Sequence, residues 1–296
     1  MTVSPSDHAV GVDARTAITV TFDRPMNEAS VLASYTSEDL PLSQLDVSWN
    51  AERTLLTLVP KTALAYATGS VAPGSTLDFL PKTYRFAFDD RALDGAGHAL
   101  EAASFSFSTL RAVSSELAAD AAHTGNWTDG AGEGVHNCLR APPRGYVPTV
   151  CIGDDSSNVR YTGFISFDLS ALPATVQSFS SARLEASGSV NGSLHALGES
   201  SLEQVPFGEL GAAALTAPAT ASFGSFFGNT ALTAGTHVEL AIDVTSAVAS
   251  DYAREPGAAK LSQYRLAFEN IYANGIWDDL ELTTSELDLA VTYFVP

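Results

Sequence analysis

The chain has 296 residues, with 34 Asp and Glu side chains against 15 Lys and Arg, and a formal net charge of −19 at pH 7. This length is typical of two hydrophobic cores rather than one. The charge argues against nucleic acid and anionic membranes as partners, because binding to either requires clustered cations.

Short runs that alternate apolar and polar residues dominate the first 110 residues. In residues 16–22, Ile18, Val20 and Phe22 share one face of a strand that a proline ends. Residues 54–59, 84–88 and 103–109 are further runs of this kind. Strands at this spacing predict a β-sandwich, and residues 27–35 are expected to add one short helix.

The order of these pieces resembles the bacterial immunoglobulin-like domain of surface-layer proteins and secreted multidomain enzymes. The resemblance is carried by Val3-Ser4-Pro5, by residues 16–26, 55–60 and 105–109. One turn departs from the family pattern, because Gly97-His98 stands where a Gly-Asn pair is usual. The resemblance implies an immunoglobulin-like β-sandwich over residues 1–112. It also implies an extracellular or bacterial cell-surface location, in a family that supports rather than catalyses.

A second module is expected over residues 113–296, after a connector that includes its first strand. Alternation returns in residues 164–168, 182–186, 238–244, 264–268 and 287–293. In residues 238–244, four aliphatic side chains share one face and two acids share the other, which predicts a core face. Residues 245–253 are expected to form a short helix that Pro256-Gly257 stops. Residues 211–228 have no clear period and predict a long loop with partly anchored phenylalanines.

The second module resembles the disaggregatase-related, or DNRLRE-type, jelly-roll domains. The matching pieces are residues 152–168, Leu172-Pro173, residues 181–184, 242–245, 263–266 and 289–293. The family implies a two-sheet jelly roll in which some members bind polysaccharide, often with a structural calcium ion. The expected fold class is therefore all-β, an immunoglobulin-like β-sandwich followed by a jelly-roll β-sandwich.

The two cysteines, Cys138 and Cys151, lie 13 positions apart in a proline-rich stretch. This spacing predicts a loop closed by a disulfide bond, which is typical of an oxidising compartment. Two buried free thiols are the alternative. Zinc is disfavoured because no further ligands have suitable spacing nearby.

Calcium is a candidate cofactor of the second module, which carries 21 acidic and 7 basic side chains. Ca²⁺ takes six to eight oxygen ligands, and Asp154, Asp155 and Asn158, together with Asp120, offer several of them. The alternative is a turn whose carboxylates accept hydrogen bonds from backbone amides. The acidity itself has a second interpretation, which is solubility.

Sugar binding is a second hypothesis for this module. Sugars stack on aromatic rings that are flanked by carboxylates and amides. Such groups occur together in one strand connection as Tyr272, Asn274, Trp277, Asp278 and Asp279. Trp127 with Asp129 makes a second group of this kind. Aromatic packing that covers one end of a sandwich is the alternative.

Catalysis has little support, because the sequence contains no nucleophile elbow, no His-Glu-x-x-His helix and no phosphate-binding glycine loop. Asp278-Asp279 with Glu281 offers carboxylates of the type that glycosidases use, but adjacent acids are common in loops without such a function. We therefore predict no catalytic residues. An unrecognised hydrolase is the third hypothesis for the chain.

The sequence predicts a non-catalytic extracellular or cell-surface protein, structural or adhesive, in which the first module presents the second. The alternative is a calcium-assisted polysaccharide-binding module pair from a secreted carbohydrate-active enzyme. The expected partners are a polysaccharide, another surface protein or copies of the chain itself. Residues 1–10 do not resemble a signal peptide and no run of 18 apolar residues occurs, which predicts a mature or trimmed fragment without membrane insertion.

Overall fold

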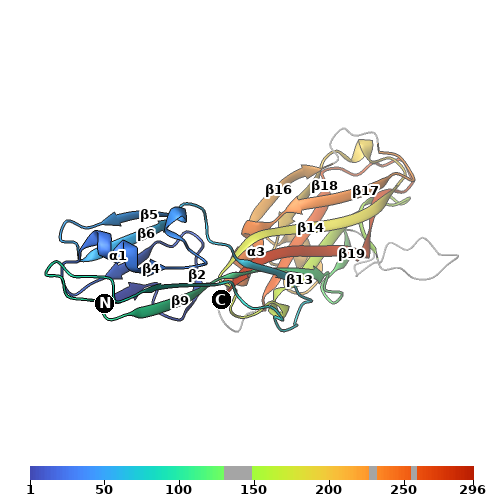
Figure 1. Ribbon diagram of the computed structural model, residues 1–296. Coiled ribbons are helices and arrows are strands. Elements are labelled where there is room, and N and C mark those ends of the chain that lie inside the picture. Colours follow the sequence, from blue (N-terminus) through green and yellow to red (C-terminus); the bar gives the residue numbers. More distant parts are fainter. Residues whose placement is uncertain (130–148, 227–231, 255–258) are drawn as a thin grey trace.

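The alternating runs of the first module form two four-stranded sheets that enclose one core. A computed structural model describes residues 1–129, 149–226, 232–254 and 259–296 of the chain (Figure 1). One sheet has the strand order β1-β3-β6-β5 and the other has the order β2-β9-β8-β4. The elements are β1 (Thr2–Ser4), β2 (Ala9–Val12), β3 (Ile18–Thr21), α1 (Glu28–Ser34), β4 (Tyr35–Thr36), η1 (Leu42–Gln44), β5 (Leu45–Trp49), β6 (Leu55–Pro60), β8 (Thr83–Phe88) and β9 (Ala103–Thr109).

The residues predicted to face the core of the first module do so. Ile18 and Val20 are fully buried, and Phe22 is 3% exposed. Phe22 stacks on Trp49 at 5.7 Å between ring centroids. The short helix α1 begins after Asn27, whose Oδ1 accepts a hydrogen bond from Ser30 N at 3.1 Å. The predicted immunoglobulin-like β-sandwich is confirmed in this part of the chain.

The second module is a larger sandwich made from one continuous hydrogen-bonded ladder. The order β16-β15-β18-β13-β12-β19-β10-β7 runs through it, with β11 on β13 and with β14 between β19 and β17. The elements are β7 (Ala67–Ser70), β10 (Arg111–Ala118), β11 (Gly125–Asp129), β12 (Thr149–Asp154), β13 (Arg160–Asp168), η2 (Leu169–Ala171), β14 (Ser178–Asn191), η3 (Leu194–Leu197), β15 (Ser200–Gln204), α2 (Ala212–Thr216), β16 (Ala221–Phe226), β17 (His237–Asp243), α3 (Thr245–Tyr252), β18 (Leu261–Phe268) and β19 (Asp278–Val295).

This ladder folds over itself, because side chains of β13 and β18 share one hydrophobic cluster with those of β14, β17 and β19. In β17, Val238, Leu240 and Ile242 are buried and the residues between them are exposed, as the alternation predicts. The predicted helix after β17 is α3. All-β architecture, with two sandwiches in sequence, is therefore confirmed.

The prediction of one long loop over residues 211–228 is wrong. Residues Ala212–Thr216 form α2 and residues Ala221–Phe226 form the edge strand β16, which pairs with β15. Phe223 is half-buried and packs on Tyr264 at 6.0 Å between ring centroids. The pattern of this segment is weak, and its pairing with β15 places the strand, because strand formation depends on tertiary context as well as on local pattern. Phe227 lies outside the described residues.

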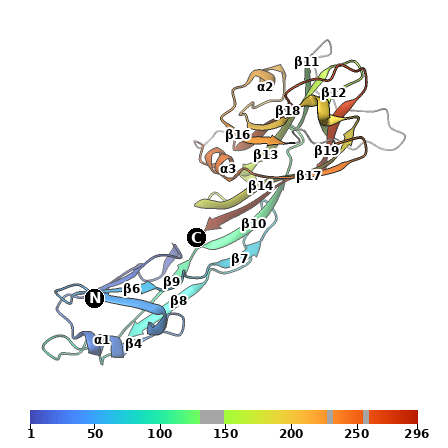
Figure 2. The same ribbon diagram turned by 90° about the horizontal axis from the view of Figure 1, so that it is seen from above.

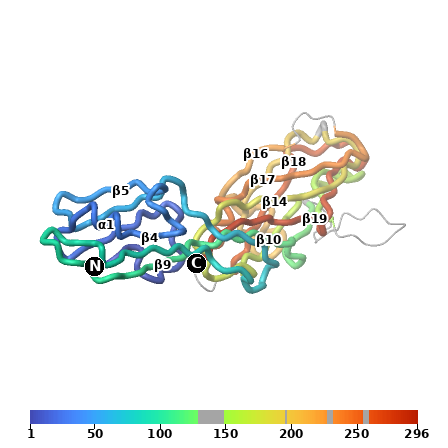
Figure 3. Tube along the Cα trace, in the orientation of Figure 1, coloured from blue at the N-terminus to red at the C-terminus, as the bar shows by residue number. Residues whose placement is uncertain are grey.

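A segment from within residues 1–112, which the sequence analysis gave to the first module, packs on the second sandwich. Strand β7 pairs in parallel with β10, and Val71, Leu77 and Phe79 pack against the second core. Figures 2 and 3 show β10 and the C-terminus meeting the first module at this junction. The Tyr66 and Phe294 rings also meet there, with 5.1 Å between centroids. The division at residues 112 and 113 stays a prediction, but the packing of residues 67–79 had no counterpart in the sequence analysis.

Candidate binding site at the end of the second sandwich

Two loops that are distant in sequence meet at one end of the second sandwich. The turn between β12 and β13 lies against the loop between β18 and β19, because Asp154 at the end of β12 pairs with Asp278 at the start of β19. Figure 2 shows β11 and β12 at the end of this module that lies away from the C-terminus. The 18 residues of β19 separate the site from the junction by roughly 50 Å.

Side chains of the first loop hold the backbone of the second. Tyr272 N donates a hydrogen bond to Asp154 Oδ2. Gly275 N donates to Asn158 Oδ1 at 3.1 Å. Asn158 adopts a φ of +61°, a conformation that Asn tolerates better than most residues. The position of Tyr272 therefore depends on Asp154, which the sequence analysis had assigned to a different site.

Asp278 has hydrogen-bond donors on both carboxylate oxygens. Ser193 N donates to Oδ1 at 2.6 Å, and the Asn274 side-chain amide donates to Oδ2 at 2.5 Å. The Asn274 Oδ1 in turn accepts from Ile276 N at 2.8 Å. These bonds connect the loop of residues 271–277 to the end of β14.

Asp154 and Asp278 are both fully buried. Burial is the main cause that raises the pKa of Asp154 to about 6, against the hydrogen bond from Tyr272 N, which lowers it. The negative charges of Asp278 and Asp155 add to the rise, and the positive charge of Arg160 opposes it. Asp154 Oδ1 has no hydrogen-bond partner among the described residues. Two buried carboxylates thus lie on paired positions of β12 and β19, where removal from water disfavours their charged forms.

Two other predicted calcium ligands, Asp155 and Asp120, have hydrogen-bond partners of their own. Asp155 Oδ1 accepts from Ser157 N at 2.7 Å and from Val159 N at 3.0 Å, which is the turn geometry considered as the alternative. Asp120 N donates a hydrogen bond to Ser166 O. Ser166 lies six residues along β13 from Arg160, the cross-strand partner of Asp154, so Asp120 and Asp154 are about 20 Å apart. Asp120 therefore does not lie with Asp154, Asp155 and Asn158.

Asp120 pairs instead with His123, whose Nδ1 lies 2.5 Å from Asp120 Oδ2. This hydrogen bond raises the pKa of His123, and the charges of Asp120 and Glu209 add to the effect. The His123 imidazole thus holds its proton more tightly in the folded state than in the unfolded state. The resulting stabilisation is present below a pH of about 6.5 and is lost as the pH rises through the raised pKa.

An NMR titration of the His123 ring should therefore give a midpoint above the ordinary value of about 6.5. Asp120→Asn should lower that midpoint, because it removes the charge and weakens the hydrogen bond. The other histidines serve as internal controls. A midpoint that the substitution leaves unchanged would refute the pairing.

The exposed surface of the site is apolar and aromatic. Ile271, Tyr272 and Ile276 are 42%, 45% and 53% exposed. Trp277 is half-buried and packs on Tyr161, with 5.8 Å between ring centroids. Tyr272 is thus the exposed ring of this loop, whereas Trp277 packs against β13. The sequence analysis missed Ile271 and Ile276, although two isoleucines in a connection of small and polar residues were a usable signal.

The remaining predicted residues lie beside this surface. Asp279 is fully buried, and its carboxylate, the Glu281 carboxylate and the Cys151 sulfur lie within 4.8 Å of one another. Trp127 lies on β11 opposite Thr162 and is half-buried. The Cys138–Cys151 disulfide stays unsupported, because Cys138 lies outside the described residues. A disulfide and a metal ion would compete for the same Cys151 sulfur.

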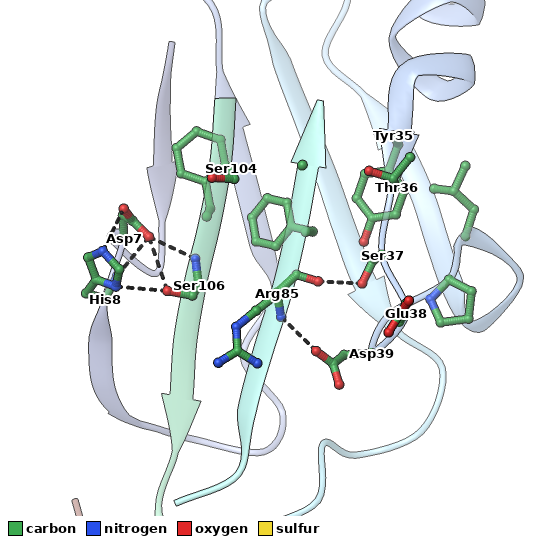
Figure 4. A pocket seen from close by; sticks show the side chains of 15 residues that line it. Asp7, His8, Tyr35, Thr36, Ser37, Glu38, Asp39, Arg85, Ser104 and Ser106 are labelled. Atoms are coloured by element: carbon green, nitrogen blue, oxygen red, sulfur yellow. Dashed lines mark hydrogen bonds and ion pairs between the residues drawn. The ribbon is translucent and has the colours of Figure 1, made fainter. Parts of the chain in front are cut away.

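The first module has a separate open groove of about 970 Å³ on the face of β8 and β9 (Figure 4). Asp7, His8 and Ser106 are joined there by hydrogen bonds, with Ser106 Oγ 2.9 Å from His8 Nδ1. The His8 side chain is 82% exposed. A nucleophilic triad works in a site that excludes water, so we interpret this trio as a surface network that ties the turn before β2 to β9.

Comparison with known proteins supports the assignment of the first module. Residues 1–109 match the family model of the bacterial Ig-like domain, so this module is a bacterial immunoglobulin-like domain. Among curated proteins, none matches the sequence. The likeness of about residues 118–294 to DNRLRE-type domains is not confirmed.

Solved structures show only distant likeness. The S-layer protein rSbsC is 12% identical with a TM-score of 0.23, over 82% of this chain and 32% of that chain. A protein solved with xylogluco-oligosaccharide is 8% identical with a TM-score of 0.20, over 100% of this chain and 56% of that chain. A structure of carbohydrate-binding modules from the β-sandwich superfamily is 11% identical with a TM-score of 0.17, over 99% of this chain and 94% of that chain. This chain thus spans about a third of the S-layer chain. TM-scores this low do not establish a shared fold.

No helix within the described ranges is long and apolar enough to cross a membrane.

Proposed function

We propose that the protein is a non-catalytic structural and adhesive protein that works outside a bacterial cell or at its surface. The immunoglobulin-like domain acts as a spacer, and the second sandwich presents the loop of residues 271–277. The observation that carries the proposal is the exposed patch of Ile271, Tyr272 and Ile276, held by side chains of another loop at the end of the molecule that points away from the junction. One of the solved structures that the chain is compared with is a surface-layer protein, but the similarity is too low to support the proposal.

The second candidate function is calcium-assisted binding of a polysaccharide, as a module pair from a secreted carbohydrate-active enzyme. It is favoured by the exposed ring of Tyr272 next to the amide of Asn274, because sugars stack on aromatic faces while amides bond to hydroxyls. A native-size measurement separates the two functions. A structural subunit should associate with copies of itself or with another surface protein, and a sugar-binding module should stay monomeric and be retarded in polysaccharide gels.

The loop itself is tested with Tyr272→Ala in a glycan array and in affinity gels. We expect a loss of binding of about tenfold, because the substitution removes both the apolar area that the ring buries, roughly 25 cal/mol per Å², and the stacking contact on its face. Leu80→Ala is the matched control, since Leu80 is 85% exposed and lies elsewhere. Trp277→Ala is a less clean variant, because Trp277 supports the fold. If neither Tyr272→Ala nor Ile276→Ala changes binding or self-association, the loop is not the contact surface.

A further inference from the structure

The groove on the first module has a floor of small side chains. The register sets Thr36 of β4, Ala87 of β8 and Ser104 of β9 in one row across the sheet, and Arg85 stands opposite Ser106 in the next row. Side chains in such rows share one face of the sheet, and the residues between them face the core. Arg85 is therefore the long side chain of this floor, in a groove of about 970 Å³ that is large enough for a small ligand (Figure 4).

The two walls of the groove already bond to the backbone of its floor. On one wall, Asp7 Oδ1 accepts a hydrogen bond from Ser106 N at 2.8 Å. On the other wall, Ser37 Oγ donates to Arg85 O at 2.6 Å, and Asp39 Oδ2 accepts from Arg85 N at 3.1 Å. These backbone atoms are not free to pair with an added strand, so a ligand in the groove must be recognised by side chains.

The Arg85 guanidinium has no counter-charge of its own. It makes no hydrogen bond or ion pair with any residue of the described ranges. Asp39 accepts from the main-chain N of Arg85, but its other oxygen lies 3.4 Å from Lys82 Nζ. Arg24 and Arg53 of the same module each form an ion pair with a carboxylate. In a chain with 34 acidic and 15 basic side chains, an unpaired guanidinium inside a groove indicates a ligand that supplies the carboxylate.

The other charged side chains that line the groove include three carboxylates. They belong to Asp7, Glu38 and Asp39, and Figure 4 shows Arg85 between Asp7 on one side and the other two on the opposite side. The hydrogen bond from Ser106 N lowers the pKa of Asp7, so this wall stays negative at neutral pH. Such a lining repels a polyanion, whereas a ligand with both a carboxylate and an ammonium group matches it.

We propose that this groove binds a short zwitterionic peptide, with its free carboxylate on the Arg85 guanidinium and an ammonium group beside Glu38. The guanidinium is a planar fork that bonds both oxygens of a carboxylate and so orients the ligand. Asp7 and Asp39 already accept from backbone N–H groups, which leaves Glu38 as the carboxylate that receives the ammonium group. The site is separate from the loop of residues 271–277. It therefore goes beyond the proposed function and does not rest on it.

The test uses N-acetylated alanine tetrapeptides with one lysine placed one, two or three residues before a free C-terminal carboxylate. Isothermal titration calorimetry of the full chain at pH 7.5 and low ionic strength should show saturable binding of at least one of them. The C-terminal amide of that peptide and its Nε-acetylated form should each bind at least about tenfold more weakly, because each lacks one of the two charges. The absence of saturable binding across the panel would overturn the proposal, as would equal affinity for the amide.

Variants of the protein assign the two contacts. Arg85→Gln should weaken binding of the free peptide at least about tenfold, and amidation of the peptide should then have no further effect. Glu38→Gln should cancel the effect of lysine acetylation in the same way. The matched control is Arg15→Gln, which removes another exposed guanidinium of the same module and should keep the parent affinity. All three positions are exposed, so the thermal midpoint should not change. A tenfold effect of amidation that persists in Arg85→Gln would overturn the assignment of the carboxylate.

An acidic oligosaccharide distinguishes a peptide from a polysaccharide as the occupant. Oligogalacturonate offers carboxylates without an ammonium group, so it should bind at least about tenfold more weakly than the peptide. Binding of oligogalacturonate that is tighter than that of every peptide, and that Arg85→Gln abolishes, would overturn the proposal in favour of an acidic polysaccharide. Tyr272→Ala should leave the peptide affinity unchanged, so failure of the proposed function at the loop of residues 271–277 is distinguishable from failure of this site.

Discussion

Gly153→Ala is expected to destabilise the second sandwich by about 3 kcal/mol or more. Gly153 has a φ of +134°, a region that side chains other than glycine rarely adopt. A Cβ there would lie 2.2 Å from Asp278 O and 2.7 Å from Asp279 Cα. Both atoms belong to the backbone of β19, which cannot move without breaking its pairing with β12 and β14. The free energy of unfolding in urea measures the effect.

The matched control for this substitution is Gly224→Ala. Gly224 has a φ of +94°, but nothing lies within 4 Å of a Cβ built on it. This variant should therefore cost only the backbone strain, about 1 kcal/mol. The difference between the two variants isolates the collision with β19. Equal costs for Gly153→Ala and Gly224→Ala would show that β12 and β19 are not packed as described.

The double variant Leu77→Ala/Phe79→Ala should detach residues 67–79 from the second sandwich. Both side chains pack against the second core, and Phe79 also lies over Gly69 of β7. Truncation of a half-buried side chain lowers the free energy of unfolding less than truncation of a fully buried one, so we expect the double variant to lose about 2–4 kcal/mol. With the β7–β10 pairing weakened, the modules should also move more freely. Urea unfolding measures the first effect, and the maximum dimension from small-angle X-ray scattering measures the second.

Leu80→Ala is the control for the junction, because Leu80 is close in sequence and 85% exposed. It should leave both the unfolding free energy and the scattering profile of the parent unchanged, within about 0.5 kcal/mol for the former. A double variant that behaves like Leu80→Ala would mean that residues 67–79 do not hold the modules together. The spacer function proposed for the first module would then lose its structural basis.

Local pattern was sufficient for most of the strands and for two helices. In β3 and β17 the alternation places side chains on one face whatever the strand pairs with, so Ile18, Val20, Leu240 and Ile242 could be assigned to cores directly. Helix α1 was also predicted, since Ala29, Leu32 and Ala33 follow helical spacing after Pro25, and the structure adds the N-terminal hydrogen bond to Asn27. By contrast, α2 and β16 have weak patterns in an Ala- and Gly-rich stretch. Strand β16 pairs with β15 and packs Phe223 on Tyr264, and the Arg265 guanidinium donates to the carbonyls of Ala214 and Leu215 in α2.

The chemistry of the site was visible in the sequence, but its assembly was not. Asp154 and Asn158 were predicted for calcium, and Tyr272, Asn274 and Asp278 for sugar, as separate groups. Only the antiparallel register of β12 on β19 sets Asp154 opposite Asp278, and nothing in either segment names its partner.

The sequence by itself thus determined two β-sandwiches, their core faces and the acidic and aromatic residues of the second. The tertiary structure alone decided that two loops form one site, that Asp120 is excluded from it, and that β7 joins the second sheet. The physical reason is that side-chain alternation is a property of each strand, whereas pairing and register depend on contacts between residues far apart in the chain.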